Sequence, residues 1–309
     1  MKILILSRNR FLYSTRRLVK AARVRGHDVE VANPLVGNLV VSQRLDLSFE
    51  QSVDGVDVVL PRIGQSITDY GLAIVRQFEM LGVPVVNRAD AIQRSRDKVQ
   101  ALQALCAAGI PIPPTVLTRT TTNIEQAIEA VGGLPVVVKT FRGTQGVGVM
   151  LLNSLASLRS ILDMMSSMGQ DIMIQRFVHE ASGRDLRVIV VGDRVVSAMR
   201  RESDKNEEFR SNLHRGGKGE PVTLHEDYER AAIDAARALG LEIAGVDVLE
   251  TSLGPMILEV NAAPGLEGIE RANNVDVADA MVEFVEEVTL SRGDRPSSSS
   301  VSSFQAVSD

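Results

Sequence analysis

Two apolar runs near the C-terminal end constrain the fold most. The first covers residues 245–250 (GVDVLE), the second covers 256–261 (MILEVN), and TSLGP separates them. Two such runs around a Gly-Pro turn predict a β-hairpin. Side chains alternate along a strand, so Glu259 and Asn261 share one face, while Leu258 and Val260 share the other. If the turn centres on Leu253, Asp247 lies opposite Glu259, about 4.5–5.5 Å away.

This hairpin face favours a bound metal ion. Two neighbouring carboxylates repel each other unless a cation lies between them. Oxygen ligands suit Mg²⁺ or Mn²⁺, and Mg²⁺ usually binds one or two carboxylates together with substrate phosphates. The simpler alternative is a solvated strand face that carries ordinary acids. Because three oxygen-bearing side chains fall in register on apolar strands, we favour a metal–phosphate site formed by Asp247, Glu259 and Asn261.

The remaining pattern predicts an α/β protein of several units. Residues 1–90 alternate strand and helix signals, which predicts a parallel α/β sheet. A second unit, 91–178, contains a glycine-rich loop, and a third, 179–290, contains the hairpins, so the C-terminal part is α+β. Residues 291–309 are rich in serine and are expected to form a disordered tail.

Composition excludes several classes of protein. The net charge of −5 and the few aromatic residues (three Tyr, eight Phe, no Trp) argue against a nucleic-acid-binding module. No apolar stretch approaches the roughly 20 residues of a membrane span. The short apolar run at the N-terminus is not expected to act as a signal peptide. With Cys106 as its single cysteine, the chain has no intrachain disulfide, and we expect a cytoplasmic location.

Two lysines and a glycine-rich loop predict phosphate binding. The loop 143–148 (GTQGVG) matches neither the Walker nor the dinucleotide pattern, and a plain hairpin turn is the alternative. Lys139 ends a run of three valines, where a phosphate is a better partner than solvent, although the side chain could also extend to water. Lys98 begins a predicted helix, where an anion would relieve its repulsion by the helix dipole; otherwise it is an ordinary exposed lysine.

Further candidates lie at strand ends and in a polar loop. Arg176 and Phe177 end a strand whose backbone could bind a base, although Phe177 also suits a core. In a hairpin with a Gly-Asp turn, counting outward places Asp185 opposite Arg200. This pair is either a cross-strand salt bridge or, with Arg187, a group for ribose and phosphate. The loop 209–217 (FRSNLHRGG) combines cations and amides that suit a triphosphate or an acyl phosphate.

In this order the residues resemble the ATP-grasp superfamily. The segments FRSNLHRGG (209–217), QFEMLG (77–82) and EVNAAPGLEG (259–268) resemble the RimK-type α-L-glutamate ligases more closely, and the resemblance runs from Met1 to about Glu287. It implies an ATP-grasp fold preceded by a Rossmann-like parallel α/β pre-ATP-grasp domain. It also implies an ATP-dependent ligase that adds L-glutamate to the C-terminus of the sixth small-subunit ribosomal protein. A homo-oligomer, with a tetramer as the expected assembly, is implied as well.

The resemblance also implies roles for individual residues. Lys98 and Lys139 would contact the ATP phosphates, and two Mg²⁺ or Mn²⁺ ions would be held by Asp247 with Glu259 and by Glu259 with Asn261. The other implied nucleotide contacts are Arg176 and Phe177 at the adenine, Asp185, and Arg210, Ser211 and Asn212 at the phosphate end. Position 176 is arginine where the family pattern has glutamate. Our candidates for stabilising an acyl phosphate are Arg187, Arg200 and Asn212.

Two other functions fit the same motifs. The first is the same ligation with another acceptor, either a carrier protein of amino-acid biosynthesis or a glutamylated cofactor. The ATP and metal residues would be identical, so acceptor-dependent ADP release is needed to separate the two. The second is a non-catalytic ATP sensor. The complete set of Lys139, Asp247, Glu259 and Asn261 argues against a sensor, which needs ATP affinity but has no need of two metals.

Overall fold

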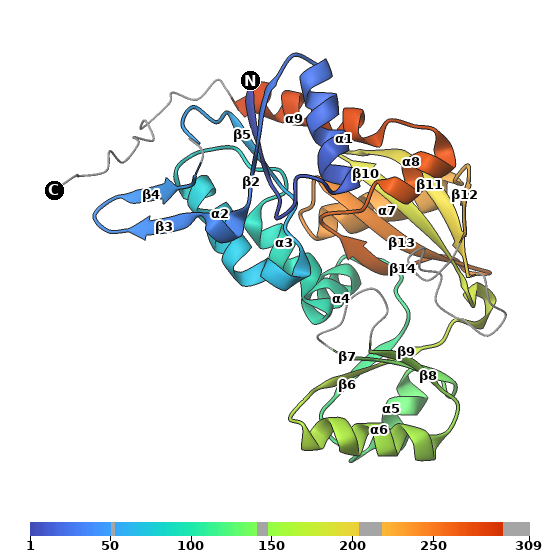
Figure 1. Ribbon diagram of the computed structural model, residues 1–309. Helices are drawn as coiled ribbons and strands as arrows, with labels where there is room; N and C mark the ends of the chain where they lie inside the picture. Colours follow the sequence, from blue (N-terminus) through green and yellow to red (C-terminus); the bar gives the residue numbers. More distant parts are fainter. Residues whose placement is uncertain (51–52, 141–147, 204–217, 293–309) are drawn as a thin grey trace.

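The computed structural model describes residues 1–50, 53–140, 148–203 and 218–292. These residues form a large lobe, which combines both ends of the described chain, and a small lobe from the middle of the sequence (Figure 1). The small lobe lies at the bottom of Figure 1, below the strands β13 and β14. The arrangement is mixed α/β with a parallel sheet in the N-terminal domain, which confirms the predicted fold class.

The N-terminal domain is built on a parallel sheet with the order β2-β1-β5. The central strand pairs with β2 and β5 along its two edges, and hydrophobic clusters cover both of its faces. Its residues Ile3, Leu4, Ile5 and Leu6 are therefore at most 1% exposed. Beyond β5, a single parallel bridge joins Val59 to Val85. The elements are β1 (Lys2–Leu6), α1 (Tyr13–Val24), β2 (Asp28–Ala32), β5 (Val58–Pro61) and α2 (Thr68–Met80).

A small antiparallel hairpin interrupts this domain in a region whose sequence predicted no element. Its strands are β3 (Asn38–Val41) and β4 (Leu45–Ser48), and it extends away from the large lobe in Figure 1. A 3₁₀ turn at Pro34–Val36 precedes the hairpin, and a second, Gln65–Ile67, follows β5. Two further helices, α3 (Ala89–Arg96) and α4 (Lys98–Ala107), follow α2.

The small lobe is an antiparallel sheet with the order β6-β9-β7-β8. One face packs on two helices through a separate hydrophobic cluster that includes Ile124, Val136, Val138, Leu158 and Ile174. The other face carries Lys139 and Gln175, because the pairs Lys139–Met173 and Val137–Gln175 share it. The elements are β6 (Thr115–Thr118), α5 (Ile124–Ala130), β7 (Val136–Thr140), β8 (Val149–Leu152), α6 (Leu155–Ser167) and β9 (Ile172–Arg176).

The C-terminal part contributes an antiparallel sheet with the order β12-β11-β10-β13-β14. Helix α7 covers one face, where Ala232 and Ala235 join the cluster of Val188 and Val246. Helices α8 and α9 cover part of the opposite face. The elements are the 3₁₀ turn His179–Ala181, β10 (Arg184–Val191), β11 (Arg194–Glu202), β12 (Lys218–Pro221), α7 (Glu226–Ala238), β13 (Ile243–Thr251), β14 (Gly254–Asn261), α8 (Glu267–Asn273) and α9 (Val277–Arg292).

The hydrophobic clusters show which parts of the described chain pack together. Two clusters run through both the N-terminal domain and the C-terminal sheet, so these two parts share their hydrophobic interior. Helices α3 and α4 pack into this shared core through Ile92, Ala101 and Leu105, although the sequence analysis counts them with the central unit. The cluster of the small lobe is separate. The described chain is therefore one large packed body with a smaller body attached.

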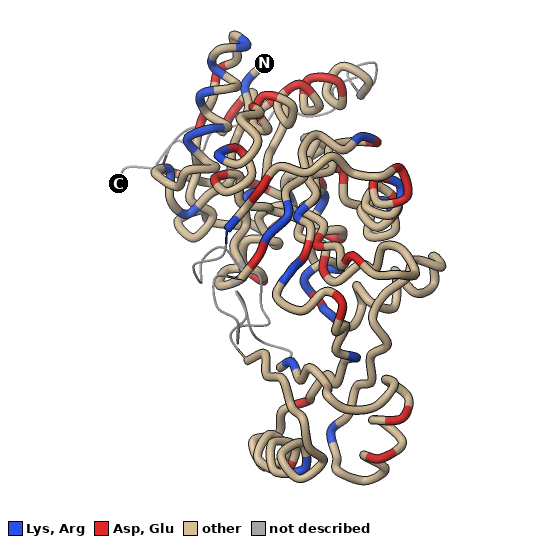
Figure 2. Tube along the Cα trace, turned by 90° about the vertical axis from the view of Figure 1, so that its right-hand side faces the viewer, with Lys and Arg blue, Asp and Glu red and all other residues tan. Residues whose placement is uncertain are grey.

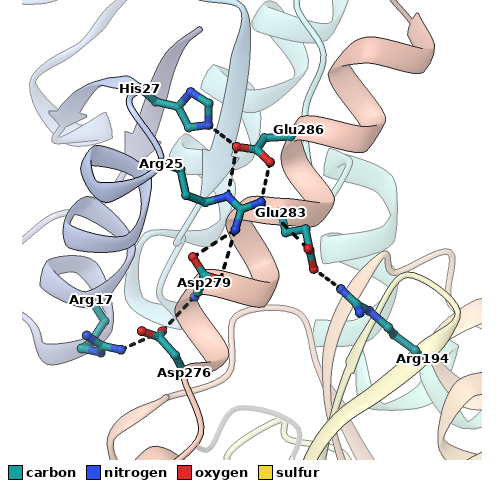
Figure 3. A network of polar contacts seen from close by, with 8 residues as sticks. All are labelled: Arg17, Arg25, His27, Arg194, Asp276, Asp279, Glu283 and Glu286. Atoms are coloured by element: carbon teal, nitrogen blue, oxygen red, sulfur yellow. Dashed lines mark hydrogen bonds and ion pairs between the residues drawn. The ribbon is translucent and has the colours of Figure 1, made fainter.

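A network of ion pairs also joins the two ends of the chain (Figure 3). Arg25, at the end of α1, donates from Nε and Nη2 to the two carboxylate oxygens of Glu286 on α9, at 3.0 and 2.7 Å. His27 Nε2 lies 2.6 Å from the same carboxylate, and Arg17 Nη2 lies 2.7 Å from Asp276. The hydrogen bonds from Arg25, together with the contact to His27, lower the pKa of Glu286. The network fixes α9 against the N-terminal domain.

Candidate functional site

The two carboxylates predicted to face each other do so. Asp247 on β13 pairs with Glu259 on β14, and Gly245 pairs with Asn261, which confirms the expected register. The turn is centred one half-residue earlier than predicted, because Thr251 pairs with Gly254, and a bulge at Leu258 then restores the Asp247–Glu259 pairing. The bulge also changes the buried face of β14, which carries Ile257 and Val260 instead of the expected Leu258 and Val260.

The two carboxylates lie in different environments. Asp247 is 5% exposed and accepts hydrogen bonds from Arg187 at 2.5 and 3.0 Å, with Arg201 Nη2 at 3.1 Å. Burial alone would raise the pKa of Asp247, but the charges of Arg187 and Arg201 keep it below its ordinary value. Glu259 is exposed and has no hydrogen-bond or ion-pair partner among the described residues. Glu259 is therefore the carboxylate that is open to a cation.

Lys139 lies near both carboxylates, although it comes from the small lobe. Burial lowers the pKa of Lys139 to about 8; Glu259 and Asp247 oppose this effect, and Lys98 adds to it. These mutual charge effects bring together four residues that the sequence analysis assigned to one site. Lys98 is the first residue of α4, whose N-terminus is capped by the Asp97 side chain. Lys98 belongs to the same lobe as the acidic hairpin, and Lys139 joins this group from the small lobe.

A chain of hydrogen bonds orients Lys139. Its Nζ donates to Gln175 Oε1 at 2.7 Å, Gln175 Nε2 donates to Thr115 Oγ1 at 2.9 Å, and the Thr115 hydroxyl donates to Pro113 O at 2.8 Å. Gln175 is 2% exposed, so its amide is held firmly. Gln175 is not among the site residues predicted from the sequence. Its place on the Lys139 face depends on how β7 and β9 pair, which the sequence alone does not show.

Arg176 points away from this face. It pairs with Val136 on the helix-covered side of the small-lobe sheet, and its side chain lies beside Gly132, which follows α5. Its backbone N–H donates to Pro114 O at 2.9 Å. The departure from the family pattern at position 176 therefore places no guanidinium on the face of Lys139. Phe177 makes an edge contact with the ring of His179, with a centroid distance of 4.7 Å.

In the hairpin of β10 and β11, the predicted pairing of Asp185 with Arg200 is wrong. Asp185 pairs with Arg201 and not with Arg200, because a bulge between Ile189 and Val190 shifts the register of β10 and β11 by one residue. Arg201 donates to the Asp185 carboxylate at 2.7 and 2.5 Å. Arg200 lies on the opposite face, where it binds Glu250 at 2.9 and 2.8 Å. Arg200 thus does not join the group around Asp247, and Arg201, which the sequence analysis missed, does.

Some predicted residues lie outside the described part of the chain. Arg210, Ser211 and Asn212 fall within residues 204–217, and most of the glycine-rich loop falls within residues 141–147. The expected tail, 291–309, is described only for its first two residues, which end α9. The roles predicted for these segments stay predictions.

The donor set fits a divalent cation. Within the described ranges no group of three or more His, Cys, Asp or Glu side chains could hold a metal, but the hairpin offers two carboxylates and an amide, which are oxygen ligands of the kind that Mg²⁺ and Mn²⁺ prefer. Asn261 Nδ2 makes one long bond, 3.5 Å, to Gly245 O. Glu259, which has no hydrogen-bond or ion-pair partner within the ranges that the structure describes, is the clearest sign of a cation-binding position. Such an ion would neutralise phosphate charge beside Lys139.

Two known domain families match this chain along most of its length. Residues 1–92 match the RimK PreATP-grasp domain and residues 95–285 match the RimK-like ATP-grasp domain. The chain belongs to the RimK family of ATP-grasp ligases. It is therefore an ATP-dependent ligase that forms amide bonds, and ATP with a divalent metal is typical of this family. No helix in the described ranges is long and apolar enough to cross a membrane.

Relatives match along almost the whole RimK-type chain. A protein of Pseudoalteromonas translucida named probable alpha-L-glutamate ligase is 44% identical over 95% of this chain and 98% of its own length. One of the same name from Thioalkalivibrio sulfidiphilus is 48% identical over 93% of this chain and 96% of its own length.

Solved structures share the fold. A RimK domain ATP-grasp protein of Sphaerobacter thermophilus has a TM-score of 0.68 at 22% identity, covering 92% of this chain and 99% of its own. The ATP-grasp ligase PsnB, solved with a minimal precursor, Mg and ADP, has a TM-score of 0.70 at 19% identity and covers 95% of this chain and 98% of its own.

Proposed function

We propose that this ligase joins the α-amine of L-glutamate to the C-terminal carboxylate of a protein acceptor, with a small-subunit ribosomal protein as the expected acceptor. The observation that carries the proposal is the partnerless Glu259 opposite Asp247, with Lys139 close to both. This combination suits a metal-bound triphosphate. The choice of glutamate rests on relatives that are 44–48% identical and carry the name alpha-L-glutamate ligase.

The proposed reaction has two steps. An oxygen of the acceptor carboxylate attacks the γ-phosphorus of ATP, the bond to the β-phosphate oxygen breaks, and ADP and an acyl phosphate result. The amine of glutamate then attacks the acyl carbon. The bond between this carbon and the phosphate oxygen breaks, inorganic phosphate leaves, and the amine loses a proton. Positioning and charge neutralisation supply most of the catalysis in such transfers. Two Mg²⁺ or Mn²⁺ ions, held by Asp247, Glu259 and Asn261, would neutralise the phosphates.

The protein residues have distinct proposed tasks. Lys98 and Lys139 bind the phosphates, and Arg187, which already bonds Asp247, remains our candidate for stabilising the acyl phosphate together with Asn212. The backbone at Arg176 and Phe177 would meet the adenine. Asp185 is already bonded to Arg201, so it would act on the nucleotide as half of that pair. Arg200 is withdrawn from this list because it binds Glu250 on the other face.

The direct test uses mass spectrometry. Candidate acceptors are incubated with the protein, ATP, Mg²⁺ and L-glutamate, and intact masses are searched for glutamyl increments. Increments on a ribosomal protein support the proposal; increments on a carrier protein or cofactor favour the other ligation. ATP binding with neither increments nor acceptor-dependent ADP release would identify a sensor.

A variant pair tests the metal assignment. We expect Glu259→Ala to abolish ADP release without loss of fold, because the carboxylate that is open to the cation is gone. Glu250→Gln is the matched control, since Glu250 comes from the same hairpin but faces the other side, and it should retain ADP release. Normal ADP release by Glu259→Ala would refute the assignment.

A further inference from the structure

The N-terminal domain holds the segment that directly follows the metal strand. This segment, residues 262–266, connects β14 to α8. Side chains from three places in the N-terminal domain bond its backbone: Asn87 Nδ2 donates to Ala262 O at 3.0 Å, Arg62 Nη2 donates to Pro264 O at 2.5 Å, and Ser14 Oγ accepts from Leu266 N at 3.0 Å. Residues of the first domain therefore reach the edge of the site.

Arg62 lies close to the metal hairpin through Pro264. Gly245, which pairs with Asn261, packs against the Pro264 ring so tightly that a Cβ at position 245 would lie 2.7 Å from Pro264 Cβ. The same Cβ would lie 3.6 Å from Arg187 Nη1. Pro264 thus contacts Arg62 on one side and the strand that carries Asp247 on the other. Arg62 is thus linked through Pro264 to the strand that carries Asp247, from the side of the N-terminal domain, whereas Lys139 comes from the small lobe.

Several arginines of the large lobe are partly or fully buried, and Arg62 shares with Arg94 a contact to a single main-chain carbonyl. Three of these arginines each bind a carboxylate, namely Arg17, Arg187 and Arg201. A fourth, Arg96, donates instead to three uncharged oxygens: Ile63 O, Gly64 O and Thr68 Oγ1. Among the described residues, the guanidinium of Arg62 bonds only the Pro264 carbonyl. Burial lowers the pKa of Arg62 to about 10. A largely desolvated guanidinium that uses one donor and has no counter-ion within the described part of the chain favours a bound anion.

The chemistry of the reaction limits which anion this is. A carboxylate that must attack phosphorus needs its lone pairs, so a guanidinium that binds it by two N–H groups would lower its reactivity. Both carboxylates of the incoming glutamate leave the reaction unchanged. They are therefore the groups that a fixed arginine can bind without inhibiting the chemistry.

We propose that Arg62 binds a carboxylate of the amino-acid substrate and makes the ligase specific for an acidic amino acid. This inference rests on the proposed function. It adds a substrate-binding residue from the pre-ATP-grasp domain to a site whose ATP and metal residues come from the other two parts of the chain.

The first test uses substrate analogues with the unaltered protein. Glutamine lacks the side-chain carboxylate, and isoglutamine lacks the α-carboxylate. One of the two should show a kcat/KM about 10–100-fold below that of glutamate, because one charge-assisted hydrogen-bond pair is worth roughly 1.5–3 kcal/mol. If both amides react as well as glutamate, no carboxylate is recognised and the inference is wrong.

The second test uses Arg62→Gln and Arg62→Lys. We expect Arg62→Gln to raise the KM for glutamate about 10–100-fold, with the KM values for ATP and the acceptor unchanged and with partial recovery in Arg62→Lys. The analogue that lacks the bound carboxylate should show the same KM with both Arg62→Gln and the unaltered protein. Arg94→Gln is the control, because Arg94 also donates to a buried carbonyl, Leu239 O at 3.1 Å, away from the hairpin.

Other outcomes overturn the inference. Parallel increases in KM for ATP and glutamate would mean that Arg62 only positions residues 262–266. An increase confined to the acceptor would place the bound carboxylate on the acceptor. If the unaltered protein ligates no glutamate to any acceptor, the proposed function itself fails; if it does so and Arg62→Gln behaves normally, only this inference fails.

Discussion

At the scale of single residues, the site separates its charges by environment. The Asp247 carboxylate is buried and already neutralised by Arg187 and Arg201, whereas Glu259, directly opposite, is exposed and has no partner among the described residues. A cation placed between them would thus exchange interactions with Asp247 but gain a new one with Glu259. We infer that Glu259 contributes most to metal affinity and that Asp247 mainly fixes geometry.

Lys139 leads to a prediction about pH. In the proposed function the ammonium form of Lys139 binds phosphate, and in the ligand-free protein burial lowers its pKa to about 8. ATP binding should therefore weaken as pH rises above 8, by about tenfold between pH 7.5 and 9, because binding then requires uptake of a proton. Calorimetric dissociation constants for ATP across this range measure the effect. Lys139→Arg is the comparison, since arginine stays charged throughout; an equally steep decline in that variant would assign the effect to another group.

At the scale of elements, the two hairpins show the same feature with opposite consequences. In β13–β14 the bulge at Leu258 compensates for a turn that lies earlier than expected, so Asp247 and Glu259 meet as predicted. In β10–β11 the turn lies where expected and the bulge shifts the pairing, so Asp185 meets Arg201 instead of Arg200. One extra residue exchanges the two faces of a strand. These bulges therefore determine which charged residues face the site.

The turn of the metal hairpin depends on Gly254. Its φ is +105°, and a Cβ there would contact nothing within 4 Å, so Gly254→Ala should act through backbone strain alone. We expect the variant to lose about 1–2 kcal/mol of stability, measured by urea unfolding. Leu253→Ala, at an 89% exposed position of the same turn, should change stability by less than about 0.5 kcal/mol. Equal stabilities for the two variants would contradict this account of the turn.

At the scale of the whole molecule, the hydrophobic clusters divide the described chain into two bodies. Two clusters run through the N-terminal domain and the C-terminal sheet, while the small lobe has its own. Basic and acidic segments lie close together along the middle of the large lobe in Figure 2. The site draws Lys139 from one body and Asp247 with Glu259 from the other. The relative position of the two bodies thus determines whether the site is assembled.

The ion-pair network between α1 and α9 supports the larger body. Arg25→Ala should destabilise the protein by about 1–2 kcal/mol near neutral pH, because Glu286 and Asp279 lose a shared, partly buried partner. Since Arg25 lowers the pKa of Glu286, this stabilisation is present above the unfolded pKa of glutamate, about 4.3, and disappears as pH falls through the lower folded value.

Urea unfolding at several pH values measures this difference. Arg194→Ala provides the control, because Arg194 pairs with Glu283 where both side chains are largely exposed, and its effect should stay below about 0.5 kcal/mol. A difference between Arg25→Ala and the unaltered protein that persists unchanged at pH 3 would exclude Glu286 as the group responsible.

The sequence by itself determined the fold class and the register of the acidic pair, and it selected the two lysines that we propose bind phosphate. These depend on local signals: strand and helix periodicity, turn residues and the alternation of side chains along a strand. Only the tertiary structure decided that Arg201 replaces Arg200 beside Asp185, that Arg176 points away from Lys139, that Gln175 bonds Lys139, and that Arg62 bonds the segment after β14. Bulges, strand order and contacts between distant segments set these features, because the packing of the whole chain selects them and no short stretch encodes them.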